Sequence, residues 1–217
     1  MPNYYPIMID ITNRKCIVVG GGKVAERKIL SLLEANGDVL VISPDTTEKM
    51  NELYHQEKIE IIKRAYTKGD LKEAYLVYVA TDKNEVNEAC LKEAREEGIL
   101  INIVDQPDMC DFIVPASIKK GDLNITISTN GKSPMLCRKI RKELELIYND
   151  EYALYIDALG KLRKQVLMDI DDIKTRKEIF RKIVYSNLLE EYKNEKVHDI
   201  EKEVMNYYEQ MKKVMTK

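Results

Sequence analysis

Three consecutive glycines, Gly20, Gly21 and Gly22, directly follow the apolar run Cys16 to Val19. With Ala25 they fit the pattern Gly-x-Gly-x-x-Ala, which in a strand-to-helix turn leaves backbone N–H groups free to bind a phosphate. The first glycine would permit the tight turn, and the second of the pattern, Gly22, would let the backbone approach a pyrophosphate. Glycine-rich turns also join strands to helices without any ligand. Their position in the first strand–helix unit of an alternating series favours nucleotide binding.

The acidic residue that usually binds the ribose at the end of the second strand is missing. The second apolar run ends in Ile42-Ser43-Pro44, and Asp45 follows in the loop. Asp45 could accept hydrogen bonds from the ribose hydroxyls. Equally, with Glu48 three residues later, it fits a capping box at the start of a short helix. No arginine lies within residues 43–47 to receive a 2′-phosphate, so we predict NAD rather than NADP as the cofactor.

Two further polar groups could take part in chemistry. Asp105 follows the apolar run 99–104, and ligands of open α/β sheets bind beyond the carboxyl ends of the strands. Asp105 would also suit an ordinary solvated turn before Gln106-Pro107. Residues 132–142 carry five basic and no acidic side chains. Such a cluster is typical of a solvated helix face, and it would also suit an anion-binding rim.

Strand and helix patterns alternate from residue 15 to residue 104. Short β-branched runs predict strands at 16–19, 39–42, 59–63, 76–80 and 99–104. Apolar residues at helical spacing, with suitable ends, predict helices at 23–35 and 84–97 and a short one after Asp45. This alternation indicates a parallel sheet with right-handed crossovers. The fold class is therefore α/β, with a Rossmann-type doubly wound sheet.

After Asp105 the pattern changes. The runs 112–115 and 123–128 predict two strands joined by a turn at 120–122. Ser133-Pro134 predicts a helix start, because serine is a favoured N-cap and proline a favoured first helical residue. The helix would carry an apolar stripe of Leu136, Ile140, Leu144 and Ile147. Only helix patterns follow. We therefore expect three segments: an α/β domain at 1–112, a small α+β region at 113–148 and a helical domain at 149–217.

Composition excludes several classes of protein. The 217 residues are 44% hydrophobic, which is enough to bury a core without disulfides. The 35 basic and 37 acidic residues nearly cancel, which argues against nucleic-acid binding. Four scattered cysteines fit free thiols in a reducing compartment, and two distant histidines argue against a metal site. No apolar run approaches membrane-spanning length, and the first ten residues do not resemble a signal peptide. We expect a soluble cytoplasmic protein.

Five motifs follow one another across residues 5–148. They are Val-Val-Gly-Gly-Gly-Lys-Val-Ala-Glu-Arg-Lys (18–28), Ala-Thr-Asp (80–82), Asn-Ile-Val-Asp (102–105), Phe-Ile-Val-Pro-Ala (112–116) and Ser-Thr-Asn-Gly-Lys-Ser-Pro (128–134). In order and spacing they resemble the precorrin-2 dehydrogenase / sirohydrochlorin ferrochelatase family, whose module also forms the N-terminal part of multifunctional sirohaem synthases. The family's Ser-Ser-Gly-Gly loop reads Ser-Thr-Asn-Gly here.

The resemblance implies roles for individual residues. It makes Asp105 the family's essential aspartate. The implied cofactor contacts, besides the glycine turn, are Lys23, Val24, Pro44, Asp45 and Thr81. The implied substrate contacts are Ser128, Thr129, Asn130 and Lys132. It also implies a homodimer in which the region 113–148 exchanges contacts between subunits.

The reaction implied by the resemblance is the NAD-dependent oxidation of precorrin-2 to sirohydrochlorin, on the route to sirohaem. A hydride leaves the macrocycle for the nicotinamide and a proton departs, with Asp105 as the base or as the group that orients the macrocycle. The carboxylates of the tetrapyrrole would give the basic cluster a role. Some relatives also insert Fe²⁺ into sirohydrochlorin, and no residue pattern decides this. A non-catalytic NAD sensor would leave Asp105 without a role.

Overall fold

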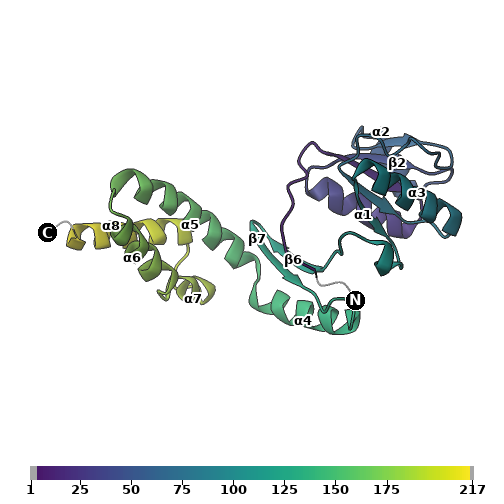
Figure 1. Ribbon diagram of the computed structural model, residues 1–217. Helices are drawn as coiled ribbons and strands as arrows, with labels where there is room; N and C mark the ends of the chain where they lie inside the picture. The colour runs from purple at the N-terminus through teal and green to yellow at the C-terminus, as the bar shows by residue number, and fades with distance from the viewer. Residues whose placement is uncertain (1–3, 216–217) are drawn as a thin grey trace. The chain divides into compact units, whose positions relative to one another are not determined.

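The computed structural model describes residues 4–215. The chain divides into two compact units, of which the first ends at Val114 and the second begins at Pro115. Figure 1 draws the first unit in purple to teal and the second in teal-green to yellow. Residues 1–3 and 216–217, at the outer ends of the first and third predicted segments, lie outside the described part. The predicted boundary near residue 148 falls inside the second unit, between two of its helices.

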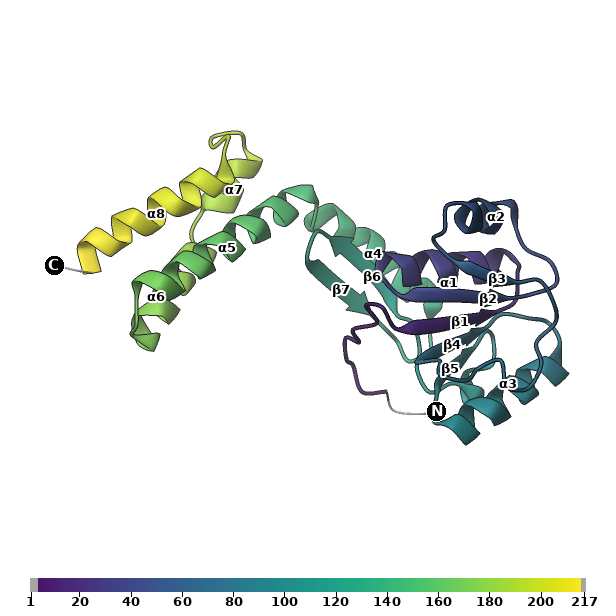
Figure 2. The same ribbon diagram turned by 90° about the horizontal axis from the view of Figure 1, so that it is seen from above.

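A five-stranded parallel sheet forms the centre of the first unit (Figure 2). Its strands are β1 (Lys15–Val19), β2 (Asp38–Ile42), β3 (Glu60–Ile62), β4 (Leu76–Val79) and β5 (Leu100–Ile103). They lie in the order β3-β2-β1-β4-β5. The helices are α1 (Lys23–Glu34), α2 (Glu48–His55) and α3 (Asn84–Glu97), and the short 3₁₀ turn η1 (Pro107–Met109) follows β5. The predicted Rossmann-type sheet is confirmed.

Successive residues of each strand are buried on opposite faces of this sheet. On β1, Cys16 and Val18 belong to the core that α1 and α2 cover, whereas Ile17 and Val19 belong to the core that α3 covers. Strands buried on both faces need apolar residues at every position, which explains the unbroken β-branched runs. With both faces covered, ligands can approach at the carboxyl ends of the strands. The strand order reverses between β1 and β4, where such sheets bind their ligands.

Of the two interpretations of Asp45, the capping box with Glu48 at the start of the second helix is wrong. The N-cap of α2 is Thr47, whose hydroxyl oxygen accepts a hydrogen bond from the N–H of Met50 at 3.3 Å. Threonine and aspartate are both good N-caps, and Thr47 is the one directly before the first helical residue. Asp45 therefore has no part in the helix end.

The prediction of a strand at residues 112–115 is also wrong. The hairpin of the second unit pairs β6 (Ala116–Lys120) with β7 (Leu123–Ile127). The tight turn at Gly121, with φ +56°, makes the residues immediately before it the partner strand. Phe112 instead packs edge-on against Tyr78 of the first unit, with 5.5 Å between the ring centroids.

Helices make up the rest of the second unit. They are α4 (Pro134–Ile147), α5 (Asp150–Asp169), α6 (Ile173–Val184), α7 (Leu188–Lys193) and α8 (Ile200–Met215). As predicted, α4 begins with a serine cap: Oγ of Ser133 accepts from the N–H of Leu136 at 3.2 Å. The helices α5 to α8 enclose one apolar core. The predicted helical C-terminal region is confirmed.

Candidate functional site

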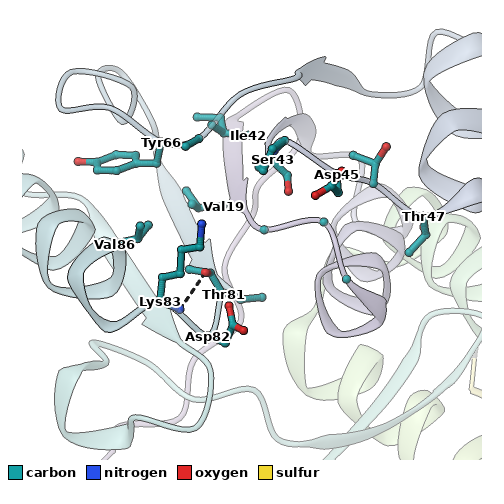
Figure 3. A pocket seen from close by; sticks show the side chains of 17 residues that line it. Val19, Ile42, Ser43, Asp45, Thr47, Tyr66, Thr81, Asp82, Lys83 and Val86 are labelled. Atoms are coloured by element: carbon teal, nitrogen blue, oxygen red, sulfur yellow. Dashed lines mark hydrogen bonds between the residues drawn. The ribbon is translucent and has the colours of Figure 1, made fainter.

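A pocket of about 530 Å³ opens at the carboxyl end of the sheet in the first unit. Its walls are the turns after β1 to β4, at residues 20–22, 43–47, 65–66 and 80–83, together with the first turn of α3 (Figure 3). This is the point where the strand order reverses, between β1 and β4. Open α/β sheets bind dinucleotides at such a point.

The three glycines of the first turn meet different structural requirements. Gly20 has φ +125°, and a Cβ there would lie 2.3 Å from the carbonyl oxygen of Ala80. A Cβ on Gly21 would lie 1.7 Å from the carbonyl oxygen of Asp45. Because neither glycine has a Cβ, the turns after β4 and β2 can pack directly against the glycine turn. Gly22 has an extended backbone (φ −85°, ψ −177°) and no atom within 4 Å of where its Cβ would be. The space beside Gly22 is open to a ligand.

Helix α1 begins at this turn without a capping side chain. Gly22 is its N-cap, and the first bond of the helix runs from the N–H of Glu26 to the carbonyl oxygen of Gly22, at 3.0 Å. The N–H groups of the first helical turn therefore have no partner within the helix. The helix dipole adds positive partial charge at the same place. Free donors beside an open backbone fit the pyrophosphate of a dinucleotide.

Asp45 lines the pocket from the loop after β2 (Figure 3). Its backbone carbonyl lies against Gly21, as described above, and its side chain is exposed. Within residues 4–215 its carboxylate makes no hydrogen bond and no ion pair. With the capping role excluded, the carboxylate is available as an acceptor for ribose hydroxyls. Pro44, before it, also lines the pocket.

Basic residues next to the pocket are mostly engaged in ion pairs. The pairs are Lys23–Glu26 at 3.1 Å, Lys49–Glu52 at 2.8 Å and Arg64–Asp70 at 2.6 Å. Among the lining residues in the described part of the chain, Lys83 is the only basic one. It lies with the turn after β4 rather than with the loop that carries Asp45 (Figure 3). No unpaired cation therefore lines that loop to receive a 2′-phosphate.

The other predicted cofactor residues differ in position. Thr81 lines the pocket, and its hydroxyl oxygen accepts from the N–H of Lys83 at 3.1 Å, just before α3. Lys23 and Val24 open α1 but do not line the pocket, and the side chain of Lys23 is 79% exposed. Their backbone N–H groups, rather than their side chains, belong to the free first turn of the helix.

Asp105 directly follows β5 and does not line the pocket. It is exposed, with φ +61°, a left-handed conformation that aspartate tolerates better than most residues. The N–H of Val104 bonds to the carbonyl oxygen of Val79 at 2.9 Å, which ties the turn to β4. Because β5 and β2 lie on opposite sides of β1 in the sheet, Asp105 and Asp45 lie on opposite sides of the glycine turn.

The predicted substrate residues lie in the second unit, in the loop between β7 and α4. Oγ of Ser128 accepts from the N–H of Asn130 at 3.0 Å, and Oγ1 of Thr129 accepts from the N–H of Ser133 at 2.9 Å. Asn130 and Lys132 are exposed. The two hydroxyl oxygens therefore stabilise the loop itself, and the side chains of Asn130 and Lys132 are open to a ligand.

Sequence reasoning missed several residues that line the pocket, among them Tyr66, Lys83 and Val86. Tyr66 lies after the short strand β3, in a segment with no periodic pattern, and the other two lie at the start of α3. In Figure 3, Tyr66 and Val86 lie on the side of the pocket opposite Asp45 and Thr47. An amphipathic pattern places a residue in a helix but does not show which residues of its first turn border a neighbouring loop.

Residues 4–215 include no helix that is both long and apolar enough to cross a bilayer. Across the same residues, no three His, Cys, Asp or Glu side chains gather in a way that could hold a metal ion. All four cysteines are free thiols.

Comparison with known proteins identifies the family. The model of the family described as "Putative NAD(P)-binding" matches residues 7–116, about half of the chain and the whole of the pocket. The chain belongs to this NAD(P)-binding family. Membership confirms the predicted nicotinamide dinucleotide as cofactor. A second family model, "Sirohaem biosynthesis protein central", matches residues 120–145, from the end of β6 through most of α4.

The chain is also similar to siroheme synthases. It is 34% identical over 189 residues to that of Ruthia magnifica subsp. Calyptogena magnifica and 32% identical over 187 residues to that of Nitrosococcus oceani. These matches cover 87% and 86% of this chain but only 40% of each relative. The predicted resemblance to sirohaem-biosynthesis proteins is thereby confirmed. The fold is similar to that of SirC, precorrin-2 dehydrogenase, with a TM-score of 0.80 and 24% identity over 95% of this chain and 100% of that one.

Proposed function

We propose that this protein uses NAD⁺ to oxidise precorrin-2 to sirohydrochlorin. The observation that carries the proposal is a dinucleotide pocket at the strand-order reversal, in a chain that continues into the sirohaem-biosynthesis segment at 120–145. Two of the similar proteins are named siroheme synthases, and the structurally similar SirC is named a precorrin-2 dehydrogenase. An NAD-dependent oxidoreductase acting on a reduced tetrapyrrole accounts for both halves of the chain.

The pocket offers a binding group for each part of NAD. The free N–H groups of α1, including those of Lys23 and Val24, would bind the pyrophosphate beside Gly22. The Asp45 carboxylate would accept hydrogen bonds from the adenosine ribose, with Pro44 beside it. Thr81 would line the bound dinucleotide from the turn after β4. When bound, the oxidised nicotinamide accepts a hydride. The protein's own task is to hold the two reactants in a reactive orientation.

Asp105 is the residue proposed to handle the proton. Oxidation of the macrocycle releases a proton as well as a hydride, and a carboxylate oxygen can accept that proton and pass it to water. Its exposure after β5 leaves the carboxylate open to a large substrate. The same carboxylate could instead orient the macrocycle by accepting a pyrrole N–H. Both roles need contact between Asp105 and the tetrapyrrole.

The basic cluster at 132–142 supports binding of a polycarboxylate. Two of its residues are paired along α4, Lys139 with Glu143 and Arg141 with Glu145. The other three are exposed and make no ion pair within residues 4–215; they are Lys132, Arg138 and Lys142. We propose that this rim binds substrate carboxylates, together with Ser128, Thr129 and Asn130 of the preceding loop.

An uncovered apolar face supports a homodimer. Of the residues of α4 only Cys137 is buried, while Leu136 is 46% and Ile147 53% exposed. The adjoining hairpin has only two strands, an arrangement that is marginal on its own. Apolar residues that stay exposed along one stripe of a helix fit an interface with another chain. We propose that a second copy of the chain covers this face.

The four free thiols support a cytoplasmic location.

The experiment that tests the function mixes purified protein with precorrin-2 and NAD⁺ and measures NADH. We expect one NADH for each sirohydrochlorin formed. A protein that binds NAD but forms no NADH would be a sensor rather than a dehydrogenase. A parallel reaction with sirohydrochlorin and Fe²⁺, followed by absorbance, shows whether metal insertion accompanies the oxidation.

A further inference from the structure

Glu93 of α3 is a buried carboxylate that the proposed function does not use. It is only 2% exposed. Its oxygens accept hydrogen bonds from the N–H groups of Gly69 and Leu71, both at 2.8 Å, and from the hydroxyl of Tyr66. Burial of a charge is costly unless hydrogen bonds compensate it, and three donors meet here. Glu93 therefore fixes the segment that follows β3.

Tyr66 connects this buried carboxylate to the dinucleotide pocket. Its ring lines the pocket in company with Val86 (Figure 3), while its hydroxyl donates to Glu93. Burial and the bond to Glu93 raise the pKa of the phenol, so the hydroxyl stays protonated and remains a donor. A ring held at its hydroxyl and at its Cβ cannot swing away. It presents one fixed apolar surface to the pocket.

We propose that the adenine of the dinucleotide lies against Tyr66, and that Glu93 is the positioning residue that holds the ring there. The inference rests on the proposed NAD binding in this pocket. The aromatic ring is accompanied by aliphatic lining residues, Ile42 and Val86 among them. A purine has flat apolar faces, and contact with an aromatic side chain stabilises a bound base.

The strand order explains why this wall suits adenine rather than nicotinamide. Tyr66 follows β3, which is the edge strand farthest from β5 and Asp105. The nicotinamide must meet the substrate, and under the proposed function the substrate contacts Asp105. The other end of the dinucleotide then lies toward β2 and β3, where Asp45 can accept from its ribose.

The test compares fragments of NAD by isothermal titration calorimetry. The ligands are NAD⁺, AMP for the adenine half and nicotinamide mononucleotide for the other half. The variants are Tyr66→Ala, Tyr66→Phe and Glu93→Gln. Tyr54→Ala is the matched control, because Tyr54 is a 45% exposed tyrosine on α2 that does not line the pocket. Thermal melting of each variant shows whether it is folded.

We expect Tyr66→Ala to weaken NAD⁺ and AMP by a similar factor of about tenfold or more, the scale of a lost aromatic contact with a base. Nicotinamide mononucleotide and the control should be unchanged. Tyr66→Phe keeps the ring and Glu93→Gln keeps the shape of the anchor, so both should weaken AMP less than Tyr66→Ala does.

Four results would contradict different parts of the inference. Wild-type affinity for AMP in folded Tyr66→Ala would overturn it, and Tyr66→Phe with wild-type AMP affinity would overturn the positioning role of Glu93. Equal weakening of AMP and nicotinamide mononucleotide would mean that the pocket has collapsed, which also contradicts a local adenine wall. A wild-type protein that binds no NAD⁺ would instead refute the proposed function.

Discussion

The substitution Gly22→Val tests most directly whether the glycine turn binds the pyrophosphate of NAD⁺. The backbone of Gly22 is extended, a conformation that suits β-branched residues, and the position of its missing Cβ is open. Gly22→Val should therefore leave the protein folded, at a cost of about 1 kcal/mol in the free energy of unfolding, because valine is a poorer N-cap for α1 than glycine. Gly21→Val should behave differently, because its Cβ would lie 1.7 Å from a backbone oxygen.

The expected effect of Gly22→Val on NAD⁺ binding is large. The valine side chain would fill the space beside the free N–H groups of α1, where the pyrophosphate would be bound. Hydrogen bonds to a charged group contribute about 1.5–3 kcal/mol each. Loss of two such bonds at the lower figure corresponds to a rise in Kd of about 10²-fold.

Calorimetric titration with NAD⁺, paired with thermal melting, measures both quantities. Gly160→Val is the matched control, since Gly160 lies on α5 and has no atom within 4 Å of its missing Cβ. We expect both variants to melt close to wild type and only Gly22→Val to lose NAD⁺ affinity. An unchanged Kd in folded Gly22→Val would refute the assignment of this turn to the pyrophosphate.

Three further predictions concern the substrate, the cofactor and the subunit contact. Asp105→Ala should lower the rate of NADH formation about 10²-fold or more while leaving the Kd for NAD⁺ unchanged; a wild-type rate would make Asp105 an ordinary turn residue. The wild type should have a higher kcat/KM with NAD⁺ than with NADP⁺, and Asp45→Ser should narrow the ratio; a wild-type preference for NADP⁺ would contradict our interpretation of residues 43–47. Leu136→Asp should convert a dimer to a monomer in light scattering, and a monomeric wild type would argue against the proposed interface.

The architecture of the first unit could be predicted because its sheet is covered on both faces. In β1 every position after Lys15 is buried, and in β4 every position is buried, so each strand appears in the sequence as an unbroken apolar run. The helices of this unit begin or end at recognisable residues, such as Gly98 with φ +69°.

The strands of the second unit were harder to predict. Its first strand, β6, has mostly polar residues and one buried side chain, Ile118. The nearby run 112–115 is more apolar, and the strand was therefore predicted there instead.

The candidate site could be predicted only where one local segment carries the signal. The glycine turn is such a segment, because strand, turn and helix follow one another directly. The wall made by Tyr66 is not, since it depends on Glu93, which lies 27 residues away. A glutamate in a helix with a charged pattern resembles a solvated residue. Glu93 becomes buried only when α3 packs against the turn after β3. The spacing of apolar residues along the sequence does not predict that contact.

The three glycines show why the motif alone cannot separate a binding turn from a ligand-free one. Gly20 and Gly21 are required by the fold itself, because backbone oxygens of two other turns occupy the space of a side chain. A protein with this sheet would need them whether or not it bound a nucleotide. Gly22 is different, because neither its dihedral angles nor its neighbours exclude a side chain. The fold leaves space for a side chain there, and the N-cap preference for glycine over valine is small, so a large loss of NAD⁺ affinity in a folded Gly22→Val protein would come from the ligand. The substitution at Gly22 therefore tests binding without testing folding.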